Sequence, residues 1–338
     1  MWPRLFVILA LTFWVGSCGP LMSAIDGGPI VVCPKDNFTK GCDVDTIGKA
    51  TGYWAQFNRS IVIRAGTYRE AFTILDHGVT IRAEPGVHIK DRAVEGKAAI
   101  LVKGNNTVIE GLECSGISVA DGNGACVKLE GRNLTLRNVY FHDSEQGLLT
   151  NRDAGTIIIE QSKFERLGRK GRGHAIYVGY SDALIVRGSQ ILSSKDQGHE
   201  IKSRAAETII ENSIIASLDG DDSRLIDISN GGRIIIRNNI LEEGPRSKND
   251  NLIAIAPEGT RYKQNEVIIE GNIIIMDHDR AYLLRLPEQD LPVTLRNNII
   301  VGGEQIEGDN TWFPDREAAG FPAYPALPPL PSSGSEMP

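Results

Sequence analysis

A short apolar strand pattern recurs along most of this 338-residue chain, at intervals of 23 to 33 residues. The intervals hold turns and further short strands but no long helical pattern, which argues against helical and leucine-rich repeats. Because such short β-branched units bury their apolar side only by stacking, the repeat predicts an all-β, single-stranded parallel β-helix (solenoid) of about nine to ten coils. The nine copies are VTIRA (79–83), TVIEG (107–111), LTLRN (134–138), IIIEQ (157–161), LIVRG (184–188), TIIEN (208–212), IIIRN (234–238), VIIEG (267–271) and VTLRN (293–297).

The fourth position of each copy carries a charge, and its sign alternates along the chain. If the units stack, each arginine lies beside a glutamate on the next coil, and opposite charges at that spacing attract. An exposed pair is worth only about 0–1 kcal/mol, but the column helps to fix the register. We therefore assign it a structural role, and the same role to stacked asparagines in the following turns, Asn239, Asn272 and Asn298. The charged column is Arg82, Glu110, Arg137, Glu160, Arg187, Glu211, Arg237, Glu270 and Arg296.

The segment IVIRAGTYREAFTI (61–74), with its strand–Gly–x–Tyr turn, resembles the opening coil of right-handed parallel β-helix proteins of the pectin-lyase-like superfamily. The resemblance covers residues 60–310 and implies a right-handed coil there. It also implies that residues 25–59 form an N-terminal cap over the apolar bore, as a solenoid requires. That superfamily includes lyases, hydrolases, epimerases and non-catalytic proteins, so the fold alone assigns no function.

The two ends of the chain do not follow the repeat. Residues 1–18 read as a signal peptide, because a positive residue precedes an apolar run too short to span a bilayer comfortably. The run ends in VGSC, which resembles a bacterial lipobox with Cys18 as the lipidated residue; cleavage near Ala24 would instead release a soluble protein. Both alternatives predict export, to the periplasm, to the outer membrane through a lipid anchor, or to the outside. The Pro- and Ser-rich residues 321–338 are expected to form a disordered tail.

The cysteine count fits an exported protein. Setting Cys18 aside leaves four cysteines, an even number that suits an oxidising compartment. Cys33 and Cys42 flank a short loop and are predicted to form a disulfide. Cys114 and Cys126 either pair in the same way or serve as small buried residues.

A second strand aligns in each coil and predicts where functional side chains gather. In AIYVGY (175–180), EIKSRA (200–205) and LIDISN (225–230), side chains alternate between the bore and the outer face. Gly-His pairs precede the first two of these strands. A base, two cations and two carboxylates then converge, which favours a functional groove over the alternative of an ordinary charged strand with histidines in its turns. With the coils in register, one outer face carries His174, Tyr177, His199, Glu200, Lys202, Arg204, Asp227 and Asn230.

The charge distribution favours an acidic ligand for this face. A net charge of −7 argues against a general nucleic-acid binder. Between Lys163 and Arg204, however, nine Lys or Arg residues stand against four Asp or Glu residues, and a basic loop there contributes Lys170 and Arg172 as substrate-binding candidates. Because a local positive potential attracts anions, we expect the partner to be an acidic, uronate-containing polysaccharide. We expect a monomer that binds no nucleic acid and contacts a membrane only through an N-terminal lipid.

The reaction expected with such a polymer is β-elimination. It needs a cation to neutralise the sugar carboxylate, a base for the adjacent C–H and an acid for the leaving oxygen. We assign Arg204 to the carboxylate, Lys202 or His199 to the base, and Tyr177 or His174 to the acid. A lysine base needs a lowered pKa, which a neighbouring arginine favours. The substrate-binding candidates beside them are Glu200, Asp227 and Asn230.

The stretch HEIKSR (199–204) resembles the Glu-Ile-x-x-Lys-Ser stretch of chondroitinase-B-like and alginate lyases, in which calcium assists a lysine base. Glu200 and Lys202 match that pattern with a shorter spacing, and Ser229 stands where an arginine is expected. We therefore assign no metal ligands and leave calcium open as a cofactor. GHEIKSRA (198–205), followed by an NGG turn, is closer to bacterial exported β-helix proteins with a GHxxKSRA motif.

Two other functions stay open at this point. In a non-catalytic carbohydrate-binding or envelope polysaccharide assembly protein, the same cations and histidines would bind carboxylates without cleaving the polymer. A uronate epimerase would leave the chain length unchanged. Two carboxylate-rich stretches, DGDD (219–222) and DHD (277–279), read as turns and not as catalytic pairs.

Overall fold

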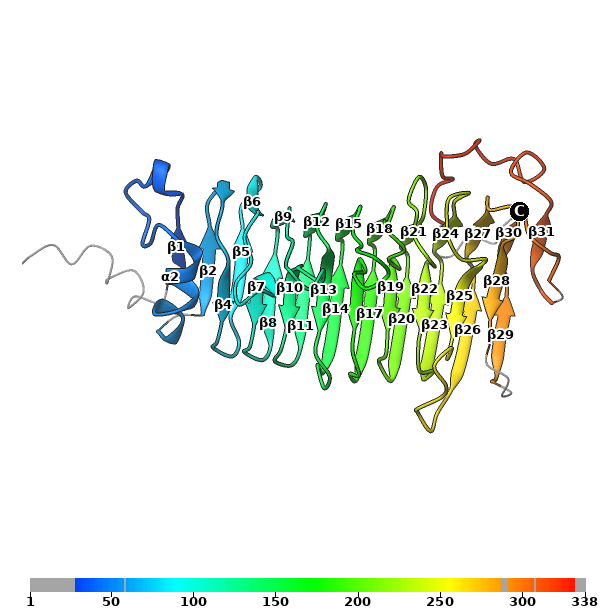
Figure 1. Ribbon diagram of the computed structural model, residues 1–338, viewed down its shortest axis with the longest axis horizontal. Helices are drawn as coiled ribbons and strands as arrows, with labels where there is room; N and C mark the ends of the chain where they lie inside the picture. The colour runs from blue at the N-terminus through cyan, green and yellow to red at the C-terminus, as the bar shows by residue number, and fades with distance from the viewer. Residues whose placement is uncertain (1–27, 58, 287–290, 307, 332–338) are drawn as a thin grey trace, which may run out of the picture.

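The computed structural model describes residues 28–331, apart from 58, 287–290 and 307. This part of the chain forms an elongated parallel β-helix in which each coil contributes one short strand to each of three parallel sheets (Figure 1). Nine complete coils run from β2 to β28 in the described residues, as the repeat predicts. None of the helices described there has the length and hydropathy needed to cross a membrane.

Sheet A contains the strands of the repeat that is visible in the sequence. Neighbouring strands are parallel, and each pairs with the equivalent strand one coil away. Its strands are β1 (Ile30–Val32), β2 (Ser60–Ile63), β5 (Thr80–Ala83), β8 (Thr107–Glu110), β11 (Leu134–Arg137), β14 (Thr156–Glu160), β17 (Ala183–Arg187), β20 (Glu207–Glu211), β23 (Arg233–Arg237), β26 (Glu266–Glu270) and β29 (Val293–Arg296).

Sheet B follows sheet A in each coil after a very short turn. Its strands are β3 (Gly66–Tyr68), β6 (Val87–Lys90), β9 (Glu113–Ser115), β12 (Tyr140–His142), β15 (Lys163–Glu165), β18 (Gln190–Leu192), β21 (Ile214–Ala216), β24 (Ile240–Glu243), β27 (Ile273–Met276), β30 (Ile299–Val301) and β31 (Thr311–Phe313).

Sheet C closes each coil. Its strands are β4 (Phe72–Ile74), β7 (Ala98–Val102), β10 (Ala125–Leu129), β13 (Gln146–Thr150), β16 (Ile176–Val178), β19 (Ile201–Ser203), β22 (Ile226–Ile228), β25 (Asn251–Ile255) and β28 (Tyr282–Arg285). Alternate residues of all three sheets point inward, and a continuous column of fully buried Ile, Val and Leu side chains fills the bore.

The alternating charges of sheet A stack as predicted. The register places Arg237 directly between Glu211 and Glu270, and the same alternation holds from Arg82 to Arg296. The Arg237 Nε donates to Glu211 over 2.7 Å, and the Arg296 Nε to Glu270 over 3.0 Å. Since the arginines are exposed, each pair contributes little energy, and the column acts mainly by penalising a slip of one coil against the next.

The turn between sheets A and B holds a buried ladder of side-chain hydrogen bonds. Asn239, Asn272 and Asn298 bond to one another as predicted: Asn272 Oδ1 accepts from the Asn239 Nδ2 and from its backbone N–H, both over 3.0 Å. Serines occupy this position in earlier coils, where Ser213 Oγ accepts from the Ser189 backbone N–H over 3.1 Å. The coils from Ser162 to Asn298 thus repeat one local solution for their turn amides, which keeps these turns aligned.

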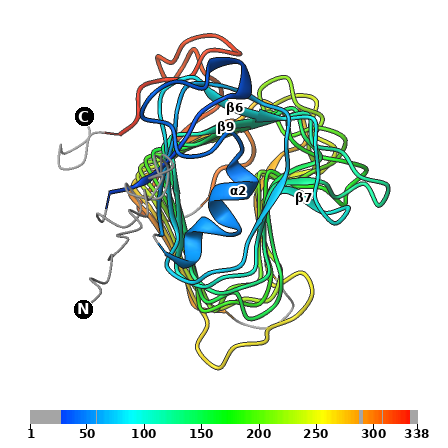
Figure 2. The ribbon, with the colours of Figure 1, turned by 90° about the vertical axis from the view of Figure 1, so that its left-hand side faces the viewer.

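The N-terminal segment packs on the first coils. Helix α2 (Ile47–Thr51), flanked by the 3₁₀ turns η1 (Lys35–Asn37) and η2 (Trp54–Gln56), contacts β1, β2 and β4. In the end-on view it lies in front of the ring of strands (Figure 2). Ile47 and Ala50 are fully buried in the core, as the apolar side chains of a cap would be. The capping role of residues 25–59 stays a prediction.

Two disulfides join cysteines that are close in sequence. Cys33 pairs with Cys42, as predicted, and Cys114 pairs with Cys126, which resolves the alternative that the spacing leaves open. The second bridge ties β9 to β10 within one coil. Residues 1–18, with the expected signal peptide and Cys18, lie outside the described residues.

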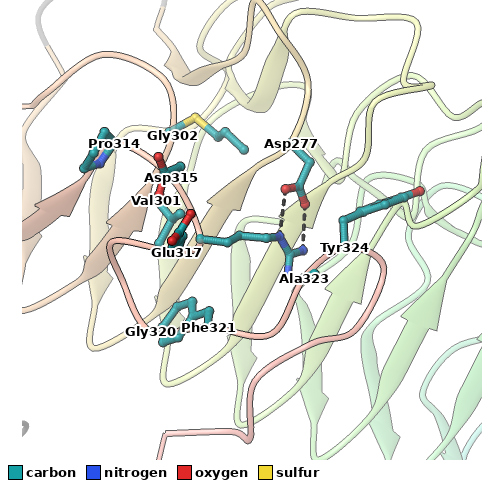
Figure 3. A pocket seen from close by; sticks show the side chains of 12 residues that line it. Asp277, Val301, Gly302, Pro314, Asp315, Glu317, Gly320, Phe321, Ala323 and Tyr324 are labelled. Carbon is teal, nitrogen blue, oxygen red and sulfur yellow. Dashed lines mark hydrogen bonds and ion pairs between the residues drawn. The ribbon is translucent and has the colours of Figure 1, made fainter.

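The C-terminal segment differs from the disordered tail that its composition suggests. Residues 321–331 lie against the outside of the β-helix, and the Tyr324 hydroxyl donates to the carbonyl of Leu218 over 2.8 Å. The Nε and Nη2 of Arg316 donate to the two oxygens of Asp277, each over 2.7 Å. Figure 3 shows Asp277 and Tyr324 among the residues that line the pocket there. Arg316 also donates to two carbonyls of the segment. A buried ion pair and apolar packing of Phe321 on sheet B therefore outweigh the low secondary-structure propensity of the segment.

Candidate functional site

The predicted functional face lies on the outside of sheet C, where β16, β19 and β22 stack. The register places Tyr177 beside Lys202 and Lys202 beside Asp227, the neighbours that the aligned strands predict. Ile176, Ile201 and Ile226 point the other way into the bore and are fully buried. The alternation of a β-strand thus presents three polar side chains on one column while their neighbours hold the coils together.

Arg204 is the best-anchored cation of this face. Its Nε donates to the Tyr177 hydroxyl over 3.1 Å, and its Nη1 donates to Asn230 Oδ1 over 2.7 Å. Glu258 accepts from Nη1 and Nη2 over 2.6 and 2.7 Å, which is the bidentate arrangement that a guanidinium offers to a carboxylate. The guanidinium is therefore oriented by two neutral groups and neutralised by one carboxylate.

Lys202 lies between two carboxylates. Its Nζ is 3.7 Å from Asp227 Oδ1 and 3.6 Å from Glu258 Oε1, and it lies 6.0 Å from the centre of the Tyr177 ring. Asp227 is buried and also accepts from the Ser229 hydroxyl over 2.7 Å and from Arg224 over 3.3 Å. Asp227 therefore holds the neighbouring cations in place from beneath and does not offer a free carboxylate to solvent.

The two histidines of the Gly-His pairs stack, as the alignment predicts. The rings of His174 and His199 are 4.8 Å apart and nearly parallel, and the His174 ring meets Tyr177 edge-on. His174 Nδ1 accepts from the His199 backbone N–H over 3.0 Å, so the proton of the neutral ring sits on Nε2. Burial lowers the pKa of His199 to about 3 and that of His174 well below its ordinary value. Both rings are neutral near pH 7 and lie behind Tyr177 and Lys202.

Glu200 does not lie on the outer face, contrary to the prediction. It is fully buried, and its Oε1 accepts from the Ser194 backbone N–H over 2.9 Å. Asp222 of the next coil lies near Glu200, and Glu243, the last residue of β24, lies near Asp222. Burial raises the pKa of Glu200 well above its ordinary value and that of Glu243 to about 9. Strict alternation fails for Glu200 because the chain bends just before β19, which turns this side chain inward.

Beside Arg204 the surface is hollowed into a pocket of about 410 Å³. The pocket contains the aromatic ring of Tyr180, over which the guanidinium groups of three arginines lie at 4.3 to 5.7 Å from its centre: Arg152, Arg204 and Arg261. The Tyr262 hydroxyl donates to the Arg204 carbonyl. The pocket thus combines cations and aromatic faces and is lined by Thr150, Asn151, Arg152, Tyr177, Gly179, Tyr180, Arg204 and Glu258.

Several residues of this site are not predicted from the sequence. Glu258, Arg261 and Tyr262 belong to the longest interval of the repeat, 33 residues between Arg237 and Glu270, and this unusual length is the signal that could have found them. Lys170 and Arg172 are exposed in the loop before β16, outside the set of pocket-lining residues. The structure thus brings together Tyr177, Lys202, Arg204, Asp227 and Asn230, places both histidines beneath them, and separates Glu200 from them.

The comparisons with known proteins agree with this architecture. A family model described as the right-handed β-helix region matches residues 73–215. The chain has the fold of a right-handed parallel β-helix. An alginate lyase from Paenibacillus sp. str. FPU-7 superposes on this β-helix protein with a TM-score of 0.54 at 19% sequence identity, over 75% of this chain and 88% of the lyase.

Two further solved structures give lower scores. A pectin methylesterase in complex with a hexasaccharide gives a TM-score of 0.47 at 12% identity, over 89% of this chain and 99% of the esterase. The Dettilon tailspike protein gives 0.39 at 12% identity, over 84% and 68%. A search of curated protein sequences finds no match. At these identities the likeness shows the fold alone.

Proposed function

We propose that this β-helix protein is exported and binds an acidic, uronate-containing polysaccharide along sheet C, which it cleaves by β-elimination. The observation that carries the proposal is Arg204, whose guanidinium is oriented by Tyr177 and Asn230 and opens on a pocket with aromatic walls. Cations bind the carboxylates of uronic acids, and aromatic faces suit the apolar faces of sugar rings. The similar alginate lyase acts on such a polymer, and two disulfides suit an exported chain.

Glu258 marks the place where a substrate carboxylate would bind. It makes with Arg204 the two parallel hydrogen bonds that a uronate would make, and its side chain is 44% exposed. It belongs to a loop segment, which can move away at a lower cost than a core strand. In this proposal the uronate replaces Glu258 on Arg204, which neutralises the sugar carboxylate and acidifies the C–H next to it.

Lys202 and Tyr177 are then the groups that move protons. Lys202, as its neutral amine, accepts the proton from C5, and its Nζ lies 3.6 Å from Glu258, the group that the uronate replaces. The C–H electrons form the C4–C5 double bond, the C4–O bond breaks, and the Tyr177 hydroxyl protonates the leaving oxygen. His174 and His199 hold the Tyr177 ring and act as positioning residues.

The test is the ultraviolet absorbance of the unsaturated uronate product, with alginate, glucuronan, pectate and glycosaminoglycans as substrates, with and without calcium. We expect Lys202→Ala and Tyr177→Phe to abolish product formation and to retain binding of the polymer. Arg204→Ala should weaken binding at least tenfold. Arg296→Ala is the matched control, because it removes an exposed arginine from sheet A and should change neither.

The second candidate is a protein that binds the polymer without cleaving it. The Arg204–Glu258 pair favours this candidate, because it shows the guanidinium binding a carboxylate. Saturable binding that Arg204→Ala weakens, with no product from any polymer, would establish this alternative. Glu258→Gln should then tighten binding, since it removes the competing carboxylate. Absence of both binding and product across the panel would refute an acidic polysaccharide as the ligand.

A further inference from the structure

A second cluster of functional groups lies on sheet B, on the coils of β6, β9 and β12. His88 on β6, Glu113 on β9 and His142 on β12 each offer one ligand atom, and these atoms lie within 4.8 Å of one another. The residues come from three successive coils, because β6 pairs with β9 and β9 with β12. The geometry points to a binding site for a divalent transition-metal ion of the zinc class, held by His88, Glu113 and His142.

The distances fit such an ion. Glu113 Oε1 is 2.9 Å from His142 Nε2 and 3.6 Å from His88 Nε2. Tetrahedral ligands that lie about 2.0–2.2 Å from zinc are about 3.3 Å apart, between these two values. His88 Nε2 also lies 2.7 Å from Ser115 Oγ, a contact that it would exchange for the ion, so a small ion can enter by local side-chain adjustment. The three side chains are 13 to 35% exposed, so solvent reaches the site and can supply a fourth ligand.

The surroundings of His142 provide an independent argument. Its Nδ1 lies 2.7 Å from Asp143 Oδ2, so an Nδ1–H donates to this carboxylate, and Nε2, 2.9 Å from Glu113 Oε1, is the ring nitrogen that faces the cluster. Arg166 in turn donates two hydrogen bonds to Asp143, over 2.9 and 2.8 Å, and Tyr140 stacks on the imidazole at 4.2 Å. A carboxylate behind a histidine is the usual outer partner of a metal-bound imidazole, because it fixes the tautomer and the ring orientation.

The ligand chemistry selects the ion. Two imidazole nitrogens and one carboxylate oxygen suit zinc-like ions, whereas calcium takes six to eight oxygen ligands. The disulfides indicate an oxidising environment, which disfavours ferrous iron. The bound ion would link three coils across sheet B, and linkage then requires that it raise the thermal stability of the folded chain. No step of the proposed elimination depends on this ion.

The test is calorimetric titration of untagged, chelator-treated full-length protein with zinc chloride, followed by thermal unfolding with and without zinc. We expect one zinc ion per chain, a raised Tm, and no comparable binding of calcium or magnesium. His88→Gln and His142→Gln should abolish this site, and Asp143→Asn should weaken it about 10–100-fold, as loss of an outer carboxylate does.

His278→Gln is the matched control, since this histidine lies in a turn after β27 and outside the cluster. Circular dichroism of each variant checks that it folds, and Glu113→Gln, which preserves the side-chain shape, replaces any variant that does not. X-ray absorption of the zinc complex should show two imidazole ligands. Absence of saturable zinc binding, or equal losses in His278→Gln and His142→Gln, would overturn the proposal.

Discussion

Replacing Asn272 by alanine tests whether the buried turn ladder stabilises the stack. The Asn272 side chain is fully buried and makes four hydrogen bonds of 2.9 to 3.0 Å. The substitution leaves the backbone N–H and one amide hydrogen of Asn239 without their acceptor. A buried donor that loses its partner costs about 1–3 kcal/mol, so two of them predict a loss of about 2–6 kcal/mol in the free energy of unfolding.

Serine at position 272 is the control, because serine fills the same turn position in earlier coils. There the Ser213 hydroxyl reaches the backbone N–H of Ser189. Asn272→Ser should therefore satisfy the Asn239 backbone N–H and cost about half as much as Asn272→Ala. The assay is urea unfolding followed by circular dichroism. A loss below about 1 kcal/mol for Asn272→Ala, or equal losses for both variants, would refute the account of the ladder, because buried amides would then find other partners.

Three further predictions concern stability. Burial raises the pKa of Glu243 to about 9 in the folded state, whereas an unfolded glutamate titrates near 4.5. The folded state therefore binds more protons between these values, and the free energy of unfolding falls as pH rises through that window. Glu243→Gln should flatten the fall in Tm measured from pH 5 to 9. Gly198→Ala should destabilise the protein by about 1–3 kcal/mol in urea unfolding, because a Cβ there lies 2.7 Å from the Gly173 carbonyl; unchanged stability would contradict this clash. Tyr324→Phe removes the bond to Leu218, and faster proteolysis of the C-terminal segment is expected, with an unchanged rate counting against its docking.

Much of the site follows from counting residues along the repeat. Strand alternation and the coil period together place Tyr177, Lys202 and Asp227 on one column, because they define both the direction and the neighbour of each side chain. The stacking of His174 on His199 follows from the same alignment. This regularity ends where the chain leaves the strands. Glu200 turns inward at a bend, and Glu258 reaches Arg204 from a loop whose path no periodicity describes.

The cluster of His88, Glu113 and His142 on sheet B cannot be predicted from the sequence either. His88 and His142 are 54 residues apart in sequence, and no local motif links them. They meet because one lies in an outward column of β6 and the other in the adjacent column of β12, with Glu113 of β9 between them. The strands of sheet B are only three or four residues long, too short for their register to be read from the sequence without the coils on either side.

The amino-acid pattern alone accounts for the solenoid, its coil period and its register, because period-two alternation and the Arg–Glu column act between neighbouring units of a repeat. The tertiary structure decided which polar groups face solvent, which are neutralised by burial and which loop side chains complete the pocket. These properties depend on turns, and the direction of a turn is set by what it packs against. Residues 321–331 illustrate this: their composition predicts disorder, but a buried Arg316–Asp277 pair and an apolar patch on sheet B hold them in place.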